Sequence, residues 1–357
     1  MKFGIALHME RQDASTPYAT VAARLLELLH MADEGGFEIA WAVEHHAHEY
    51  LIGPNPLLQL VNWAPQTRRI RLGTAVLCAP YWHPIRLAEE IAMADILTGG
   101  RLEVGLARGA FQYEFDRMVN GLPQVQGGEH LREALPVIKK LWQGDYEHQG
   151  KHWSFPTSTA TPKPFQVPHP PLWVASRDEQ TFDFAVKNGL SVMTTAHRLP
   201  FAEVESLLGK YARALERNPG AVRRRFMTAR MTCVYEDPKE WTIPVLAMRE
   251  SVRIFMALFN NASPVVEGFP QPIELDERDA RGDYRLEALR ENMMFGTPDE
   301  VVAKLRRYEA AGVDMFNLNA AFGLPHERVV RSLRLFIDEV MPHFVPRSTA
   351  AIAVGAR

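Results

Sequence analysis

The chain has 357 residues, of which 46% are hydrophobic and 23% charged, and its formal net charge is -3. This length fits either two domains or one large α/β barrel. The nearly balanced charge excludes the electrostatic footprint of a protein that binds nucleic acid or an anionic membrane surface. The two cysteines, Cys78 and Cys233, exclude a disulfide framework, and no apolar run reaches the ~20 residues of a membrane span. These features predict a soluble, cytoplasmic protein.

Short apolar runs alternate with helical patterns along the whole chain. The runs typical of buried strands are 2–7, 39–43, 70–77, 101–107, 172–175, 190–195, 226–235 and 315–318. Several of the intervening helical patterns end at a glycine, such as Gly189 or Gly312, which is a common helix terminator. About eight such β-α units predict a closed TIM (β/α)8 barrel. An open doubly wound sheet remains an alternative, although no Gly-x-Gly-x-x-Gly follows a predicted strand.

Two long stretches interrupt this alternation, one after the fourth predicted strand and one after the seventh. Residues 145–171 are rich in proline and aromatic residues, and residues 260–292 are rich first in proline and then in charge. Long insertions in a compact domain are commonly lids or binding loops, so 260–292 is predicted to be a mobile lid. We therefore expect one domain over residues 1–345, followed by a disordered tail over 346–357.

The most unusual stretch follows the second predicted strand. Residues 44–49 read Glu-His-His-Ala-His-Glu and hold three imidazoles and two carboxylates. Buried charges are costly unless they are paired, so this cluster suits a cleft better than a core. In a parallel barrel the active site lies at the C-terminal ends of the strands. That rule selects this cluster together with Arg108 after the fourth strand and His197 after the sixth.

A metal site is one reading of this cluster. His45 and His46 are adjacent and point to opposite faces of an extended segment, and the chain has no His-Glu-x-x-His spacing. We therefore predict no metal, and keep a metal-dependent barrel hydrolase that uses His45 and His48 as an alternative. Histidines that are hydrogen-bonded at the barrel rim for structural reasons are the other alternative.

Two further side chains suit an anionic ligand. The guanidinium of Arg108 can bind a phosphate or carboxylate with two hydrogen bonds, or it can form a salt bridge to Glu103 or Glu114. Thr181 lies near the start of the helix after the fifth strand. There its hydroxyl can contribute to an anion site or simply cap the helix.

Short motifs occur in a fixed order along the chain. They are Met-Lys-Phe-Gly at 1–4, Glu-His-His at 44–46, Glu49, Gly-Thr-Ala at 73–75, His-Pro-Ile-Arg at 83–86, Gly-Gly-Arg at 99–101, Arg-Gly at 108–109, Gly-Thr-Pro at 296–298, Leu-Phe at 335–336 and Val-Met-Pro at 340–342. Each motif is short, but their order and spacing together are specific. With them the chain resembles the bacterial luciferase-like flavin-dependent monooxygenases over nearly its whole length.

The resemblance implies a TIM barrel that binds FMN at the C-terminal ends of its strands, in a homodimer. His45 has the place of the catalytic histidine, flanked by Glu44 and His46, and is expected to do acid/base work and to stabilise a flavin peroxide. The other implied cofactor contacts are Ala75 and Val76, as a non-prolyl cis peptide under the flavin, Arg108 on its phosphate, Glu114 close to the flavin, and Ser176, Arg177 and Thr181. The expected substrate pocket is lined by Tyr50, Trp82, Phe111 and Tyr113.

The chain also departs from the family's pattern. Ala107 stands where the luciferases carry a cysteine beside the flavin, so light emission is not expected. Asp178 stands where a phosphate-binding serine is expected, and its carboxylate would repel a phosphate unless it points away. Ala47 replaces a bulky aromatic of the aldehyde pocket, so a long-chain aldehyde is not the expected substrate.

The missing dinucleotide fingerprint bears on the source of electrons, because a monooxygenase must receive two of them. Reduced FMN is expected to come from a separate NAD(P)H:flavin reductase. The chain is therefore predicted to be the oxygenase component of a two-component system that uses O2 to oxygenate a small cyclic, heteroaromatic or carbonyl compound. A deazaflavin-dependent hydride-transfer enzyme and a non-catalytic flavin-binding protein are the alternatives.

Overall fold

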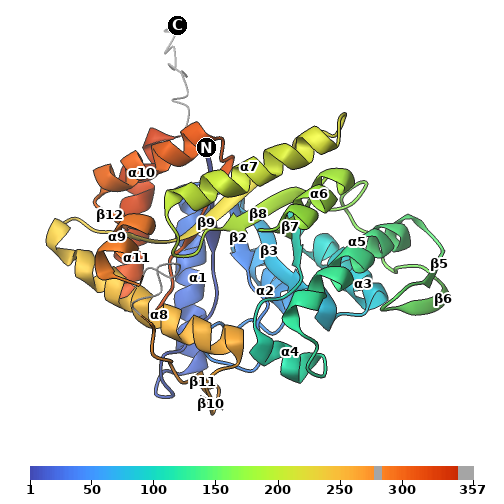
Figure 1. Ribbon diagram of the computed structural model, residues 1–357, viewed down its shortest axis with the longest axis horizontal. Coiled ribbons are helices and arrows are strands. Elements are labelled where there is room, and N and C mark those ends of the chain that lie inside the picture. The colour runs from blue at the N-terminus through green and yellow to red at the C-terminus, as the bar shows by residue number, and fades with distance from the viewer. Residues whose placement is uncertain (277–283, 345–357) are drawn as a thin grey trace, which may run out of the picture.

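A closed barrel of parallel strands forms the centre of the molecule in the computed structural model, which describes residues 1–276 and 284–344 (Figure 1). Its strands are β1 (Lys2–Ala6), β2 (Ile39–Ala42), β3 (Arg71–Cys78), β4 (Leu102–Ala107), β7 (Leu172–Ala175), β8 (Ser191–Thr195), β9 (Phe226–Val234) and β13 (Met315–Asn319). Each strand pairs in parallel with the next, and β13 pairs with both β9 and β1, which closes the ring. The predicted TIM barrel is thus confirmed. The predicted tail 346–357 lies outside the described residues.

Helices surround the barrel. They include α1 (Tyr18–Gly35), α2 (Pro56–Trp63), α3 (Pro84–Leu97), α5 (Gly127–Gln143), α6 (Glu179–Asn188), α7 (Phe201–Arg217), α10 (Pro298–Ala311) and α11 (His326–Leu335). Capping residues determine where these helices begin and end. Thr297 and Glu300 form a capping box at the start of α10, and Gly312 ends this helix in the left-handed conformation. No helix in the described part of the chain is long and apolar enough to cross a membrane.

The two insertions contain more regular structure than the sequence predicts. Within 145–171, β5 (Tyr146–Gln149) and β6 (Ser154–Ser158) form an antiparallel pair. A long helix that is not predicted from the sequence, α8 (Thr242–Asn260), leads into the second insertion. Within 260–292 the structure has the hairpin β10 (Val265–Val266) and β11 (Phe269–Pro270) and then α9 (Leu286–Asn292), and β12 (Met294–Gly296), which pairs with β9, follows the insertion. The predicted mobility of 260–292 stays a prediction, and 277–283 lie outside the described residues.

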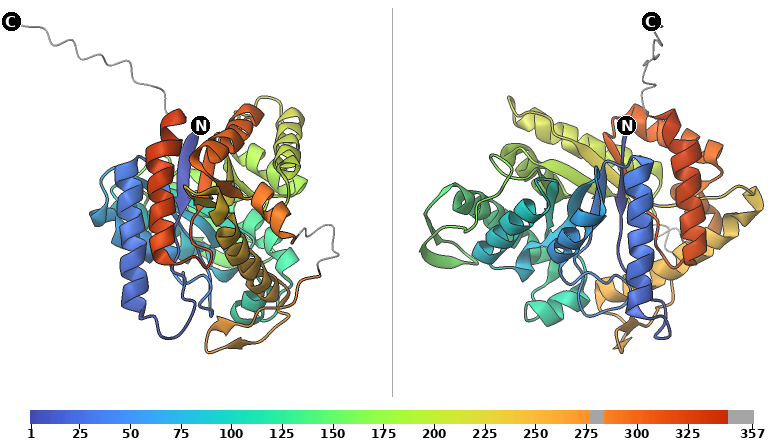
Figure 2. Two further views of the ribbon diagram at one scale, coloured as in Figure 1. Left: turned by 90° about the vertical axis from the view of Figure 1, so that its left-hand side faces the viewer. Right: turned by 180° about the vertical axis from the view of Figure 1, so that it is seen from behind.

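The insertion gathers at one end of the barrel. Figures 1 and 2 show α8 and the β10–β11 hairpin beside α4 (Gln112–Met118), at the end of the molecule opposite the N-terminus. This is the end at which the barrel strands finish. The C-terminal mouth of the barrel, where TIM barrels place their active sites, is therefore covered by α4, α8 and the hairpin.

The barrel interior is filled in its middle by large side chains. Trp41, Trp173 and Met193 belong to this layer, together with Ile39, Met227 and Met315. The layer is packed closely, since a Cβ added at Gly73 would lie 2.4 Å from the Trp41 ring. Below it, Glu103 accepts hydrogen bonds from Trp173 Nε1 and Arg71 Nε, both at 2.6 Å. The lower half of the barrel is therefore a closed core.

The next inward positions towards the mouth are small. By the alternation of side chains along a strand, the residues that follow the large layer include four alanines, Ala75, Ala107, Ala175 and Ala229, together with Thr195 beyond Met193. Ala75 and Ala175 pack directly on the large layer. Apart from Thr195, these four small side chains form the floor of the mouth, which we call the alanine floor.

Replacing Gly73 by Ala should test how tightly the large layer is packed. The added methyl would overlap the Trp41 ring, so we expect the free energy of unfolding to fall by about 1–3 kcal/mol in denaturant titration. Gly209→Ala in the middle of α7 is the matched control and should raise it by about 0.5–1 kcal/mol, because alanine is the better helix former. Equal effects of the two changes would contradict this account.

Candidate active site

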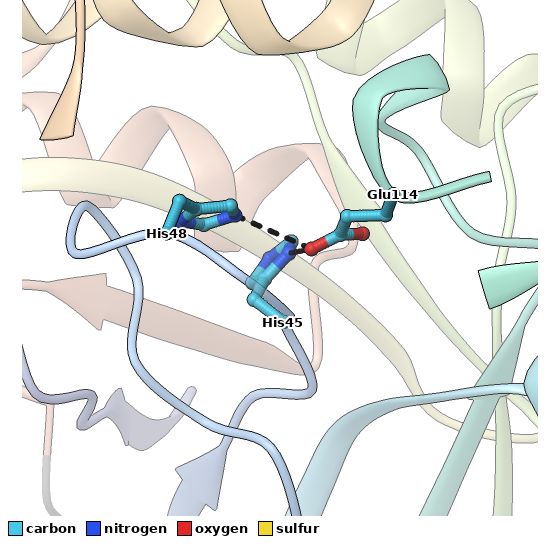
Figure 3. Close-up of side chains that lie close together, drawn as sticks. All are labelled: His45, His48 and Glu114. Carbon is cyan, nitrogen blue, oxygen red and sulfur yellow. Dashed lines mark hydrogen bonds and ion pairs between the residues drawn. The ribbon is translucent and has the colours of Figure 1, made fainter. Parts of the chain in front are cut away.

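The carboxylate of Glu114 is the centre of the candidate site (Figure 3). Glu114 lies on α4 and is fully buried. Its Oε1 contacts His45 Nδ1 at 2.8 Å, the backbone N of His46 at 2.9 Å and His48 Nε2 at 3.3 Å. Its Oε2 accepts a hydrogen bond from the Tyr81 hydroxyl at 3.3 Å. One carboxylate therefore holds the whole histidine segment against α4.

Glu114 is ionised in this setting. Burial opposes its ionisation, but the charge of His45 and the hydrogen bonds from His45 and His48 outweigh that effect, so the pKa of Glu114 is lowered. A carboxylate only accepts hydrogen bonds, so each ring nitrogen that contacts it must donate. His45 therefore carries a proton on Nδ1, and its Nε2 is left for a ligand.

The protonation of His48 follows from its second contact. Its Nδ1 accepts the backbone N–H of Leu51 at 3.3 Å, so the proton of the neutral ring lies on Nε2, which donates to Glu114. Burial lowers the pKa of His48 and favours this neutral form. His48 is thus a fixed support for Glu114.

These contacts bear on the metal reading. Donor atoms of His45, His48 and Glu114 lie within 4.8 Å of one another, so the structure does bring together the two histidines that a metal reading requires. A metal ligand must offer a lone pair, whereas His48 Nε2 and His45 Nδ1 both donate protons to Glu114. The arrangement is that of a hydrogen-bonded network.

Glu44 and Trp82, predicted as a catalytic and a pocket residue, lie behind the mouth. Glu44 is 2% exposed, and it accepts hydrogen bonds from Cys78 N at 2.5 Å and Trp82 Nε1 at 2.9 Å. His46 Nε2 is 3.2 Å from the same carboxylate. Trp82 packs in the main core and is not part of the aromatic cluster beside His45. These contacts tie the end of β2 to the end of β3 and support the histidine segment.

The other predicted pocket residues do come together. Tyr50, Phe111 and Tyr113 form a buried cluster with Leu258 of α8. Phe111 stacks on the His45 ring with centroids 4.8 Å apart, and Phe255 of α8 lies edge-on to Phe111 at 5.4 Å. The sequence analysis missed this contribution of α8. The apolar spacing 245, 248, 252, 255, 258 is a helical signal that would have revealed it.

The predicted flavin contacts on β3 and β4 have distinctive geometry. The peptide bond between Ala75 and Val76 is cis, as the resemblance implies, and it lies where the β3–β4 pairing is irregular. Arg108 is exposed at the end of β4, and its guanidinium has no hydrogen-bond or ion-pair partner within residues 1–276 and 284–344. Glu103 and Glu114, its alternative salt-bridge partners, are engaged elsewhere. Arg108 is therefore open to an anion.

The predicted contacts after β7 are less open. Asp178 caps α6 and accepts hydrogen bonds from the backbone N of Thr181 at 2.8 Å and from its hydroxyl at 2.9 Å. Arg177 pairs with Glu203 at 2.9 Å, and the buried Ser176 hydroxyl donates to the Asp178 carbonyl at 3.2 Å. In this arrangement Asp178 takes up the hydroxyl that the resemblance assigns to the phosphate.

His8 is a further residue of the mouth that sequence reasoning missed. It continues the inward row of Gly4 and Ala6 beyond β1, and that row is the signal that would have found it. Its Nε2 is buried without a hydrogen-bond partner among the described residues. Burial, and then the charge of His45, lower the pKa of His8 to about 4. His8 is thus a neutral imidazole beside His45.

Comparison with known proteins identifies the family of this chain. The family model "luciferase-like monooxygenase" matches residues 1–315. The chain belongs to the luciferase-like monooxygenase family. It is 40% identical over 344 residues to the oxygenase component of a flavin-dependent trigonelline monooxygenase from Acinetobacter baylyi, covering 96% of each chain. The expected family and monooxygenase class are thereby confirmed.

Solved structures share the fold of the family. The oxygenating constituent of the 3,6-diketocamphane monooxygenase of Pseudomonas putida, in complex with FMN, superposes with a TM-score of 0.76 at 20% identity, covering 97% of this chain and 99% of that one. An F420-dependent secondary alcohol dehydrogenase superposes with a TM-score of 0.74 at 17% identity, covering 97% of this chain and 100% of that one. At these identities both likenesses show the fold alone.

The buried His8 should make stability depend on pH. Its pKa is about 4 in the folded chain and about 6.5 in the unfolded one, so the unfolded state binds the extra proton between these values. The free energy of unfolding should therefore fall by about 3 kcal/mol from His8 alone as the pH falls from 6.5 to 4. In denaturant titrations, the free energy of unfolding of His8→Asn should fall less steeply with falling pH than that of the wild type. The surface variant His343→Asn should show the same pH dependence as the wild type. An unchanged slope in His8→Asn would contradict this assignment.

Proposed function

We propose that this protein is the oxygenase component of a two-component FMN-dependent monooxygenase, which oxygenates a small heteroaromatic compound. The observation that carries the proposal is the His45–Glu114 pair at the barrel mouth. An ionised, buried carboxylate fixes His45 Nδ1–H, and the opposite nitrogen is left beside an aromatic cluster. This is the geometry of a positioned acid/base group in a water-poor pocket.

The residues at the mouth fit a flavin. The alanine floor offers a flat apolar surface for its ring, and the irregular segment at Ala75 and Val76 lies on this floor. The unpartnered guanidinium of Arg108 offers two parallel N–H groups to a phosphate. Ser176, Arg177 and Thr181 are the further phosphate contacts that we propose. Thr181 would serve only if it exchanges its bond to Asp178 for one to the phosphate.

Each part of the site has a role in the proposed reaction. When bound, reduced FMN would supply the two electrons with which one oxygen atom of O2 enters the substrate while the other leaves as water. His45 would hold and move a proton at Nε2, and Glu114 would keep its ring in place. His46 and Glu44 support that segment from behind. Tyr50, Phe111 and Tyr113 would exclude water and line the substrate pocket.

The insertion after β9 is proposed as the lid. It contacts both sides of the mouth: the backbone N of Glu49 donates to the Gly268 carbonyl at 2.7 Å, and Arg198 bonds the Tyr284 hydroxyl at 3.0 Å. The described parts of 260–292 therefore contact the segment after β2 through Gly268 and the turn after β8 through Tyr284. Opening at these contacts would admit ligands, and closing would keep water out.

The partners follow from the same proposal. A separate NAD(P)H:flavin reductase would supply reduced FMN, which is supported by the words "oxygenase component" in the name of the Acinetobacter relative. A homodimer and a cytoplasmic location are part of the proposal. The relative's substrate, trigonelline, is the N-methyl betaine of nicotinic acid. A flat heteroaromatic ring of this kind suits the row of aromatic side chains beside His45.

Deazaflavin-dependent hydride transfer is the closest alternative, because the fold is shared with an F420-dependent enzyme. Anaerobic titration with reduced FMN and with reduced F420, followed by an 18O2 pulse with trigonelline as probe, separates the two. We expect tight binding of reduced FMN and 18O in the product. Tight binding of F420 alone, inert to oxygen, would overturn the proposal, and stoichiometric metal without flavin affinity would favour the hydrolase reading.

The role of His45 should appear in the same assay. His45→Ala removes the proton-carrying nitrogen but leaves Arg108 and the alanine floor, so reduced FMN should bind within about threefold of the wild type. Oxygen transfer to the probe should fall by about 10²- to 10⁴-fold, with hydrogen peroxide formed in its place. The surface variant His343→Ala should behave as the wild type. If His45→Ala still transferred oxygen to the probe as the wild type does, without releasing hydrogen peroxide, the assigned role would be contradicted.

The role of Arg108 can be isolated with riboflavin, which lacks the phosphate. Arg108→Ala should weaken FMN binding by roughly 10- to 100-fold, because it removes charge-assisted hydrogen bonds, and should leave riboflavin binding unchanged. Arg86→Ala, an exposed arginine that pairs with Glu90, is the matched control. An equal loss for both flavins would place Arg108 outside the phosphate site.

A further inference from the structure

A row of aromatic rings crosses the barrel mouth from one wall to the other. It starts at His45 after β2 and passes through Phe111 before α4, with centroids 4.8 Å apart. Phe255 of α8 follows at 5.4 Å from Phe111, and the ring of His197 after β8 lies 5.4 Å from Phe255. His197 is thus the far end of a row that begins at the proposed acid/base residue.

The position of His197 is enforced by its surroundings. Its backbone is left-handed, with φ of 48°, a conformation that costs energy in a non-glycine residue and persists only where neighbours impose it. Its N–H donates to the Thr195 hydroxyl at 3.1 Å, and its carbonyl accepts a hydrogen bond from Arg230 Nη1 at 2.6 Å. Such a built turn points to a function for the side chain that it holds.

Arg230 is unusual in its own right. It is 1% exposed, and its other hydrogen bonds go to the Tyr308 hydroxyl and the Pro200 carbonyl. It has no carboxylate partner in the described part of the chain. A buried charge without an ion pair is costly, yet this one is directed at two carbonyls of the 197–200 turn. Arg230 is therefore a positioning residue for His197.

The two ends of the ring row have opposite electrostatic surroundings. Glu44 and Glu114 lie behind the His45 end. Burial, and then the charges of Arg177, Arg198 and Arg230, lower the pKa of His197 to about 3. His197 is therefore a neutral imidazole in a positive field. Arg177 pairs with Glu203, and Arg198 bonds the Tyr284 hydroxyl, so these cations contribute charge without having to touch a ligand.

The imidazole of His197 is open to a ligand. Its ring nitrogens have no hydrogen-bond partner within residues 1–276 and 284–344, and the residue keeps some solvent exposure although it lies deep among its neighbours. A neutral imidazole offers one N–H donor, which in a positive field suits an anionic acceptor. A carboxylate carried by an aromatic ring would meet this donor when the ring lies along the row.

We propose that His197 binds the carboxylate of an aromatic substrate, and that it selects carboxylated rings over rings without this group. The inference rests on the proposed function and names the substrate class of that site. The ring lies against the partly exposed His45 and Phe255, beside the buried Phe111, with its carboxylate on His197 and the atom to be oxygenated nearer His45. A betaine ring suits the mouth especially well, because its cationic end then faces the side of Glu114.

Calorimetric titration of the full chain with matched probes tests this inference without turnover. The pairs are trigonelline against N-methylpyridinium and nicotinate against pyridine, each with and without saturating oxidised FMN. The wild type should bind the carboxylated member of each pair roughly tenfold or more tightly, as expected for a charge-assisted hydrogen bond. His197→Gly accepts the left-handed backbone without strain, and in this variant the ratio of the two affinities within each pair should be close to one.

A conservative variant separates binding from structure. His197→Asn keeps an N–H donor and tolerates the left-handed conformation, so it should retain most of the preference for the carboxylate. FMN affinity should be unchanged in both variants, which shows that the mouth is intact. The inference would be overturned, even if FMN binds, by either of two results. The wild type could show no preference for the carboxylated probes, or His197→Gly could keep the preference of the wild type. Failure of the wild type to bind reduced FMN in the anaerobic titration would instead refute the proposed function, and the ratios of probe affinities could still be measured.

Discussion

Everything at the mouth of this barrel depends on one buried carboxylate. Glu114 accepts hydrogen bonds from two imidazoles, a backbone N–H and a phenol hydroxyl. A single side chain of α4 therefore fixes the conformation of the segment that follows β2. An ionised group in this position is stable only while these donors remain, and the donors keep their orientation only while the charge remains. The geometry of the proposed site and its local stability therefore depend on the same contacts, and a change at either end of the network is expected to affect both.

The sequence predicts the barrel well because every strand is a short apolar run and the helix ends have clear signals, such as the capping box at Thr297. It also places His45, Arg108 and Phe111 at the correct end, since strand ends follow directly from strand positions. It does not predict the partners. That Glu44 lies behind the site with Trp82, and that Asp178 holds Thr181, depends on side-chain directions set by packing across distant segments. The contribution of α8 was missed although its apolar spacing is helical.

The insertion after β9 shows why the long segment matters for function. Its described parts touch the segment after β2 through Gly268 and the turn after β8 through Tyr284, and Asn292 donates to the Arg198 carbonyl at 2.9 Å. Residues that are far apart in sequence thereby share one cover. α8 adds the ring that links Phe111 to His197. The proposed lid and the proposed wall of the substrate pocket thus both lie between β9 and β12, so changes in this segment are expected to alter access and selectivity together.

The large layer of Trp41, Trp173 and their neighbours has a consequence for the order of events. Because a methyl group cannot be added at Gly73 without overlapping an indole, the large layer is closely packed, and among the described residues the mouth is the open side of the alanine floor. Whatever lies deepest must arrive first and depart last. In the proposed function, a flavin held on that floor would be covered by a substrate bound above it, so the flavin is expected to bind before the substrate and to leave after it.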